Sequence, residues 1–239
     1  MTRETLPVLF QDDNLIAVHK PSGLLVHRTD IDRHETRFAV QILRDQIGQK
    51  VYPVHRLDKG TSGILLFALD PEIARQVGGQ FERNEVAKTY LAVVRGHPPE
   101  SGEIDHPLSR QFDDYEWKTG GVHAPQDAVT RYRRLATCEL PYPVDRYPAS
   151  RYALLELNPI TGRRHQLRRH LKHISHPIIG DATYGKGRHN RLFRELFGSR
   201  RMLLASVRTQ LAHPATGKLL LLEAPPSTDF ASVLLQLGW

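Results

Sequence analysis

The residues of this chain with the clearest potential for chemistry lie in the nonapeptide HRLDKGTSG, residues 55–63. It places one carboxylate, Asp58, close to the cation Arg56 in a glycine-containing segment. A carboxylate in such a loop can act as a nucleophile that forms a covalent adduct and leaves again, or it can stabilise an ion pair. The alternative is that Asp58 only accepts hydrogen bonds from the amides of its own turn, as aspartates in turns commonly do.

Two other kinds of site are suggested by residue type alone. His55, Asp58 and Ser62 are the residue types of a serine hydrolase, but the chain has no G-x-S-x-G elbow, and closeness in sequence does not make a triad. A group of histidines at 165, 170, 173 and 176 suggests a metal site. The first two fall on different faces of a helix, and no cysteine or carboxylate cluster completes a tetrahedral set. We therefore expect no metal.

The elements that must position Asp58 can be read from the flanking pattern. Residues 51–54 and 64–67 are strand-like, and the turn at 60–63 between them puts Asp58 near a strand end. Residues 163–174 contain neither glycine nor proline and repeat apolar side chains at Leu167, Leu171 and Ile174, which predicts a helix. Arg168 flanks that apolar stripe, so it is placed to enter a partly dry cleft.

The nonapeptide resembles the HRLD-x-x-TSG nucleophile motif of the RluA-type pseudouridine synthases. Further motifs of that family occur in the family's order. AKTYLAVVRG at 87–96 resembles its Lys-x-Tyr strand, and TGRRHQLRRHL at 161–171, followed by HPIIGD at 176–181, resembles its basic motif. KPSGL at 20–24 resembles an upstream element. The resemblance covers almost the whole chain.

The resemblance implies an isomerase that breaks the N-glycosidic bond of uridine, turns the uracil and rejoins it through C5. This reaction needs no redox cofactor, metal or phosphate donor, and the sequence shows no P-loop and no GxGxxG fingerprint, so we expect no cofactor. Asp58 is then the catalytic carboxylate. Arg168 is its expected partner, with a planar guanidinium that could pair bidentately. Tyr90 is expected to stack against the uracil or to help remove the C5 proton.

A uridine within a stem must be flipped out of the stack before it can enter such a pocket. By resemblance, Arg56 projects into the space that the flipped base leaves. Either Leu203 or Leu204 is expected to pack beside the base. The other residues expected to contact RNA are His55, Lys20, Arg163, Arg164, His165 and Arg169, because cations along a phosphate backbone give sequence-independent affinity.

The order of elements predicts an α+β fold with a large, mostly antiparallel mixed sheet flanked by helices, and the resemblance implies the pseudouridine synthase catalytic fold. Strands are expected at 15–19, 51–54, 63–69, 88–95, 128–136, 152–159 and 202–211. We expect residues 1–239 to form a single catalytic domain without an N-terminal S4-type RNA-binding domain. Loops at 113–126 and 141–150 are long, and we expect at least one of them to contact RNA.

Composition limits the class of protein. The 239 residues carry a formal net charge of +7, which favours polyanionic partners, and 40% of them are hydrophobic, enough for a core. No apolar run approaches the roughly 20 residues that cross a bilayer, and the single cysteine, Cys138, excludes an internal disulfide. We expect a cytoplasmic monomer that binds RNA and no membrane.

The RNA substrate is suggested by segments outside the catalytic motifs, at 25–28, 43–49, 146–148 and 188–191. They resemble the branch of the family that modifies transfer RNA at uridine 65 in the T stem. A ribosomal RNA or another transfer RNA uridine is the alternative, since the branches share the catalytic motifs. A protein that binds or folds RNA without chemistry is the non-enzymatic alternative.

Overall fold

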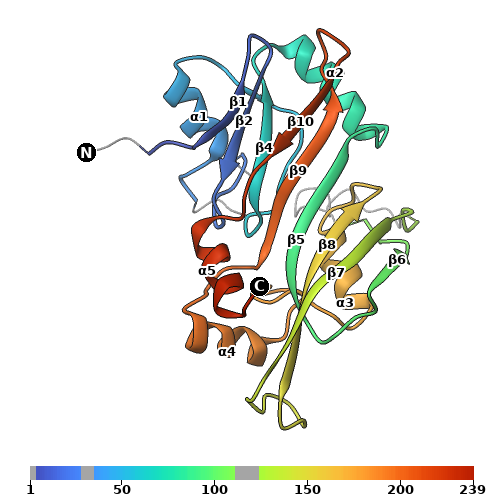
Figure 1. Cartoon of the computed structure of the whole chain (residues 1–239). Coiled ribbons are helices and arrows are strands. Elements are labelled where there is room, and N and C mark those ends of the chain that lie inside the picture. Colours follow the sequence, from blue (N-terminus) through green and yellow to red (C-terminus); the bar gives the residue numbers. More distant parts are fainter. Residues whose placement is uncertain (1–3, 28–34, 111–123) are drawn as a thin grey trace.

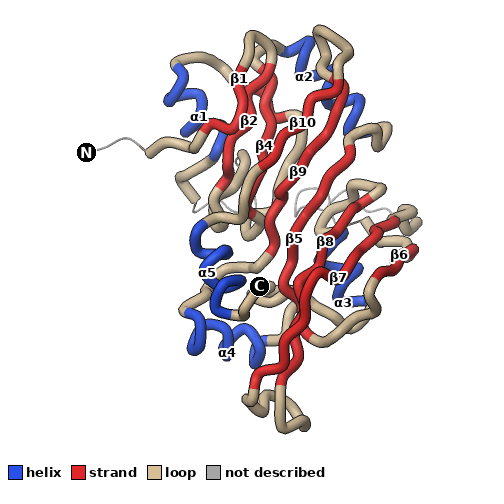
Figure 2. Tube along the Cα trace, viewed as in Figure 1, coloured by secondary structure: helices blue, strands red, loops and turns tan. Residues whose placement is uncertain are grey.

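The computed structural model describes residues 4–27, 35–110 and 124–239, which form one sheet with helices packed against it (Figures 1 and 2). The strands are β1 Val8–Gln11, β2 Leu15–Lys20, β3 Tyr52–Pro53, β4 Ser62–Ala68, β5 Ala87–Arg95, β6 Ser101–Asp105, β7 Val129–Leu140, β8 Ser150–Pro159, β9 Leu204–Ala212 and β10 Leu219–Glu223. The helices are α1 Ala39–Ile47, α2 Pro71–Glu82, α3 Gln166–His173, α4 Gly187–Phe197 and α5 Thr228–Gln236.

The ten-stranded sheet has the order β1-β2-β4-β9-β5-β8-β7-β6, with β3 beside β4 and β10 beside β9. Strands β4 and β9 run parallel, with Ser62 opposite Ala205. Every other described pair of neighbouring strands is antiparallel. The expected α+β class with a large, mostly antiparallel sheet is confirmed.

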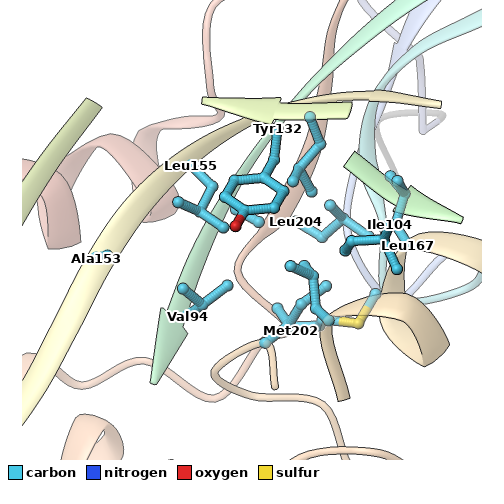
Figure 3. Close-up of a cluster of buried hydrophobic side chains, with 12 residues drawn as sticks. Val94, Ile104, Tyr132, Ala153, Leu155, Leu167, Met202 and Leu204 are labelled. Carbon is cyan, nitrogen blue, oxygen red and sulfur yellow. The ribbon is translucent and has the colours of Figure 1, made fainter. Parts of the chain in front are cut away.

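Strand β5 divides the core because successive side chains of a strand point to opposite faces of the sheet. Val94 packs on one face against Leu167 of α3, in the cluster that Figure 3 shows. Its neighbour Val93 packs on the other face with Phe193 of α4 and Phe230 of α5. Helix α3 therefore lies on the opposite face of the sheet from α4 and α5.

The expected strands correspond to β2, β3, β4, β5, β7, β8 and β9, although β3 is shorter than residues 51–54. The helix expected from residue 163 begins at Gln166, because His165 has a φ of 55° and left-handed backbone cannot belong to a right-handed helix. Of the two expected long loops, 141–150 forms the tip of the β7–β8 hairpin, whereas residues 113–123 lie outside the described residues, as does Arg28.

Within the described ranges, no helix is long and apolar enough to cross a bilayer. In the same ranges, no group of three or more His, Cys, Asp or Glu residues is arranged to hold a metal ion.

Candidate active site

The loop that carries Asp58 joins β3 to β4. The carbonyl oxygen of Asp58 accepts a hydrogen bond from the Thr61 amide at 3.0 Å, which closes a turn. Beyond it, Gly63 has a φ of 106°, and a Cβ there would lie 2.0 Å from the carbonyl oxygen of Ser206 on β9. Only glycine fits this close approach of β4 to β9. Gly63, the glycine of the TSG triplet, thus fixes where the chain enters β4 after the loop.

Lys20 supports this loop from inside the protein. Its side chain is fully buried, and its ammonium donates to the carbonyl oxygens of Leu24, Pro21 and Lys59 at 2.7, 3.0 and 3.2 Å. Burial lowers the pKa of Lys20 to about 7, while the charge of Asp58 acts in the opposite direction. The expectation that Lys20 contacts RNA is wrong, because the amine is enclosed; it orders the 58–61 turn instead.

Arg201 fixes the start of β4 from another side. Its guanidinium donates to the hydroxyl of Ser62 at 2.6 Å and to the carboxylate of Asp229, in the first turn of α5, at 2.8 Å. The Arg201 side chain is only 8% exposed. Strand β4, which follows the Asp58 loop, is therefore linked through Arg201 to helix α5.

Arg168 lies between two carboxylates. Its Nη1 donates to Oδ2 of Asp58 at 3.1 Å, while Nε and Nη2 donate to the two carboxylate oxygens of Asp181 at 2.7 and 2.9 Å. The expected bidentate pair with Asp58 is thus formed with Asp181 instead, and Asp58 receives one hydrogen bond. Burial would lower the pKa of Arg168, but the hydrogen bonds and charges of Asp181 and Asp58 raise it. Arg168 therefore stays cationic.

Asp181 is itself held in a tight turn after α3. Its Oδ1 accepts the amides of Thr183 and Tyr184, each at 2.9 Å. The preceding Gly180 has a φ of 80°, and a Cβ there would lie 1.8 Å from the carbonyl oxygen of Arg201. The Gly-Asp pair of HPIIGD thus lets the backbone pass close to residue 201 and aims the carboxylate at Arg168.

His165 faces the other oxygen of Asp58. Its Nε2 lies 3.8 Å from Oδ1 of Asp58, and its Nδ1 lies 3.0 Å from the hydroxyl oxygen of Tyr184, within hydrogen-bond distance. The Tyr184 ring also lies 4.9 Å from the guanidinium carbon of Arg168. Burial lowers the pKa of His165, and the Asp58 charge only partly offsets this, which favours the neutral ring. From the described residues, Oδ1 of Asp58 accepts no hydrogen bond.

Tyr90 approaches the same pocket from β5. Burial, and then the charge of Asp58, raise the pKa of Tyr90 to about 12, while a hydrogen bond with Ser206 lowers it. Its hydroxyl therefore remains protonated at neutral pH. Of the two leucines proposed to pack beside the base, Leu204 lines the pocket, whereas Leu203 packs in the cluster on the opposite face of the sheet. That result corrects the expectation for Leu203.

These side chains surround a cavity of about 530 Å³. This is within the usual range for small-molecule sites, roughly 300–1,000 Å³. Asp58, Tyr90, Arg168 and Leu204 lie along its wall with the cations Arg56, Lys88, Arg163 and Arg164. The wall also includes Glu82 and Phe81, so the cavity combines two carboxylates and the rings of Tyr90 and Phe81 with an excess of positive charge, which suits a group attached to a polyanion.

The remaining predicted RNA contacts differ in their surroundings. Arg56 is exposed, and Arg163 donates to the carbonyl oxygen of Asp127 at 2.9 Å. His55 stacks on Phe81, with ring centroids 4.6 Å apart, and its Nε2 accepts the Leu66 amide at 3.0 Å. Arg169 does not line the cavity; it donates to the carbonyl and hydroxyl oxygens of Ser109 at 2.9 and 3.0 Å.

Several residues of the site were not assigned from the sequence. Asp181 and Tyr184 hold Arg168 and His165, Lys88 lines the cavity, and Arg201 fixes Ser62. Asp181 could have been found from the sequence, because it is the last residue of the HPIIGD motif and few carboxylates lie within the motifs. Lys88 also carried a signal, as the lysine of the Lys-x-Tyr motif, whereas Arg201 lies in none of the motifs and carried no comparable signal.

Comparisons with known proteins agree with this geometry. The family described as RNA pseudouridylate synthase matches residues 14–173. Proteins named tRNA pseudouridine synthase C are 46% identical over 98% of this chain and 96% of the protein from Vibrio vulnificus, and 53% identical over 89% of this chain and 88% of the protein from Pasteurella multocida. A relative of the same name from Pectobacterium carotovorum is 50% identical, and this chain covers 62% of its length.

Solved structures show the same fold. Human RNA pseudouridylate synthase domain containing 4 matches with a TM-score of 0.70 at 29% identity, over 97% of this chain and 93% of that chain. Human RNA pseudouridylate synthase domain containing 1 matches with a TM-score of 0.71 at 26% identity, over 94% and 85%. With the carboxylate loop, the basic helix and these likenesses together, the chain belongs to the RNA pseudouridylate synthase family, in its RluA-type branch.

Proposed function

We propose that this chain converts uridine to pseudouridine in transfer RNA. In that reaction the bond from C1′ to N1 breaks and a bond from C1′ to C5 forms. The hydrogen on C5 is lost as a proton, and N1 gains a proton from solvent. The observation that carries the proposal is the ion pair of Asp58 with Arg168, at 3.1 Å in the wall of the cavity. Relatives that share 46–53% identity are named for this activity on tRNA.

Asp58 is the proposed catalytic carboxylate. Its Oδ2 accepts the hydrogen bond from Arg168, and Oδ1, which lies 3.8 Å from Nε2 of His165, is the oxygen available to react. A carboxylate can add to the substrate and then leave, or it can assist removal of a ribose proton, and both routes use the same oxygen. Arg168 stabilises the negative charge that returns to Asp58 when it leaves the adduct in the first route, or when it gives the proton back to the ribose in the second.

Tyr90 and Leu204 are proposed to hold the uracil. The Tyr90 ring offers a stacking surface, and its hydroxyl can relay the C5 proton by releasing its own proton to water as it takes up the one from C5. A base in a stem reaches this cavity only after flipping, which costs a few kcal/mol of stacking and pairing. Arg56 is exposed at the cavity and is proposed to occupy the space that the base leaves.

The proposed target is uridine 65 in the T stem, and all 239 residues are proposed to form one catalytic domain. Support for this target comes from the segments at 43–49, 146–148 and 188–191, which lie outside the shared catalytic motifs. A ribosomal RNA uridine or another transfer RNA uridine is the alternative target.

The test uses the purified protein, without added nucleotide, on unmodified transfer RNA tritiated at uracil C5. We expect tritium release and a single pseudouridine that maps to position 65. Release from ribosomal RNA alone would keep the reaction and reject the substrate. Binding without release from either RNA would reject the enzymatic function in favour of an RNA-binding role.

A further inference from the structure

Helix α4 carries a row of exposed cations that the reaction does not use. Lys186 precedes the helix, and Arg188, Arg191 and Arg194 follow at intervals of three residues on its solvent side. His189 and Phe193 form the buried side. Arg200, just beyond the helix, is also exposed. We refer to Lys186, Arg188, Arg191, Arg194 and Arg200 as the α4 surface.

These arginines differ from many of the surface arginines elsewhere in the chain. Eight exposed guanidiniums pair with carboxylates, those of Arg37, Arg44, Arg75, Arg83, Arg131, Arg133, Arg151 and Arg208. In the part of the chain that the structure describes, Arg188, Arg191 and Arg194 have no ion pair. Asp145 lies 3.2 Å from Nε2 of His189, and this hydrogen bond and, to a smaller extent, the charge of Arg188 lower its pKa. The helix itself carries one acid, Glu195, beside Arg194.

Helix stability does not account for this arrangement. Like charges three residues apart destabilise a helix, and Arg188 lies near the positive end of the helix dipole. No acidic residue occupies the first turn of α4. A bound polyanion would relieve both effects, because phosphates pair with arginine and also favour helix N-termini.

The α4 surface begins close to the active site. Tyr184, whose ring contacts Arg168, precedes Arg188 by four residues, so their Cα atoms lie within about 14 Å. Lys172, an exposed cation of α3, has its ammonium 5.7 Å from the same ring. The helix then extends for roughly 16 Å on the face opposite α3, at the lower left of Figure 1. A ligand that reaches both places must be larger than one nucleoside.

We propose that the α4 surface binds the phosphate backbone of the substrate RNA at a distance from the reacting uridine. This inference rests on the proposed function, because it takes the RNA in the cavity and the RNA on α4 to be one molecule. Backbone contacts of this kind set affinity and register without reading sequence. They lower Kd and KM, and they leave the chemical step unchanged.

The test replaces three arginines together, in R188Q/R191Q/R194Q, and measures binding of unmodified transfer RNA at several salt concentrations. Each lost phosphate contact lowers the slope of log K against log salt by about 0.7–0.9. We therefore expect a slope smaller by about 2 to 3 and a Kd raised on the order of tenfold. The rate of tritium release at saturating RNA should match that of the unaltered chain.

Two control variants sharpen the result. R75Q/R131Q/R208Q makes the same change in net charge at arginines that already pair with neighbouring carboxylates, and it should leave the slope nearly unchanged. R188K/R191K/R194K keeps the charge and should keep the slope. Equal losses in R188Q/R191Q/R194Q and R75Q/R131Q/R208Q, or no loss in either, would overturn the proposal. Because binding is measured apart from tritium release, failure of the proposed reaction would be seen separately.

Discussion

Asp181→Asn tests whether Arg168 must be hydrogen-bonded to Asp181 in order to be positioned against Asp58. The Asp181 carboxylate is fully buried and accepts two hydrogen bonds from the guanidinium, at 2.7 and 2.9 Å. Asparagine has nearly the same shape, but it removes the negative charge and leaves one acceptor oxygen in place of two. The change therefore weakens the ion pair and hydrogen bonds that position Arg168, with little change in packing.

The size of the effect follows from these contacts. A hydrogen bond to a charged group contributes about 1.5–3 kcal/mol, and breaking a buried ion pair costs about 3–5 kcal/mol. Arg168 keeps Asp58 as a partner, so we expect a loss of about 3 kcal/mol in the free energy of unfolding. For a chain of this size that lowers the melting temperature by roughly 6–12 °C. A guanidinium misplaced by about 1 Å would also slow the reaction by about 10²-fold.

The assay combines thermal unfolding with single-turnover tritium release at saturating RNA. Asp229→Asn is the matched control, because Asp229 also pairs with an arginine, Arg201, but its side chain is 60% exposed. We expect the control to lose less than about 1 kcal/mol. If Asp181→Asn has the melting temperature and the single-turnover rate of the unaltered chain, the positioning role of Asp181 is refuted.

Three further variants test other parts of the account. Burial lowers the pKa of His55 from 6.5 to about 4, so stability should be lost as pH falls through that window, by up to about 3 kcal/mol, and urea unfolding of His55→Asn should show a weaker pH dependence. Gly63→Ala should lower the melting temperature, because the new Cβ would meet the Ser206 carbonyl, whereas Gly78→Ala, which meets open space in α2, should not. Tyr90→Phe should slow single-turnover release about 10²-fold without changing Kd, and an unchanged rate would assign Tyr90 to stacking alone.

The sequence predicted those features that depend on local pattern. The alternating apolar residues of β5 and the buried run of β4 identified the strands, and the stripe of Leu167 and Leu171 identified α3. The short strands β1, β6 and β10 were not predicted, since β1 and β6 lie at the ends of the sheet and β10 pairs with β9 alone. At four or five residues each, they are too short for a clear alternating pattern.

The site shows the same limit. The motifs brought Asp58 and Arg168 together, but they did not reveal that the guanidinium is shared with Asp181, because that division depends on the turn at Gly180 and its contact with residue 201. A lysine in a motif suggested RNA contact, whereas Lys20 is enclosed by backbone carbonyls. The outcome depended on burial, which motif matching does not report.

The central claim is that Asp58 performs the chemistry while other residues bind the RNA. The most direct measurement is single-turnover tritium release by Asp58→Asn on C5-tritiated transfer RNA, with the Kd for the same RNA measured in parallel. Asparagine keeps an oxygen for the Arg168 hydrogen bond but lacks the charged nucleophile. We predict no detectable release and a Kd within a few-fold of the unaltered chain; release at an undiminished rate would contradict the account.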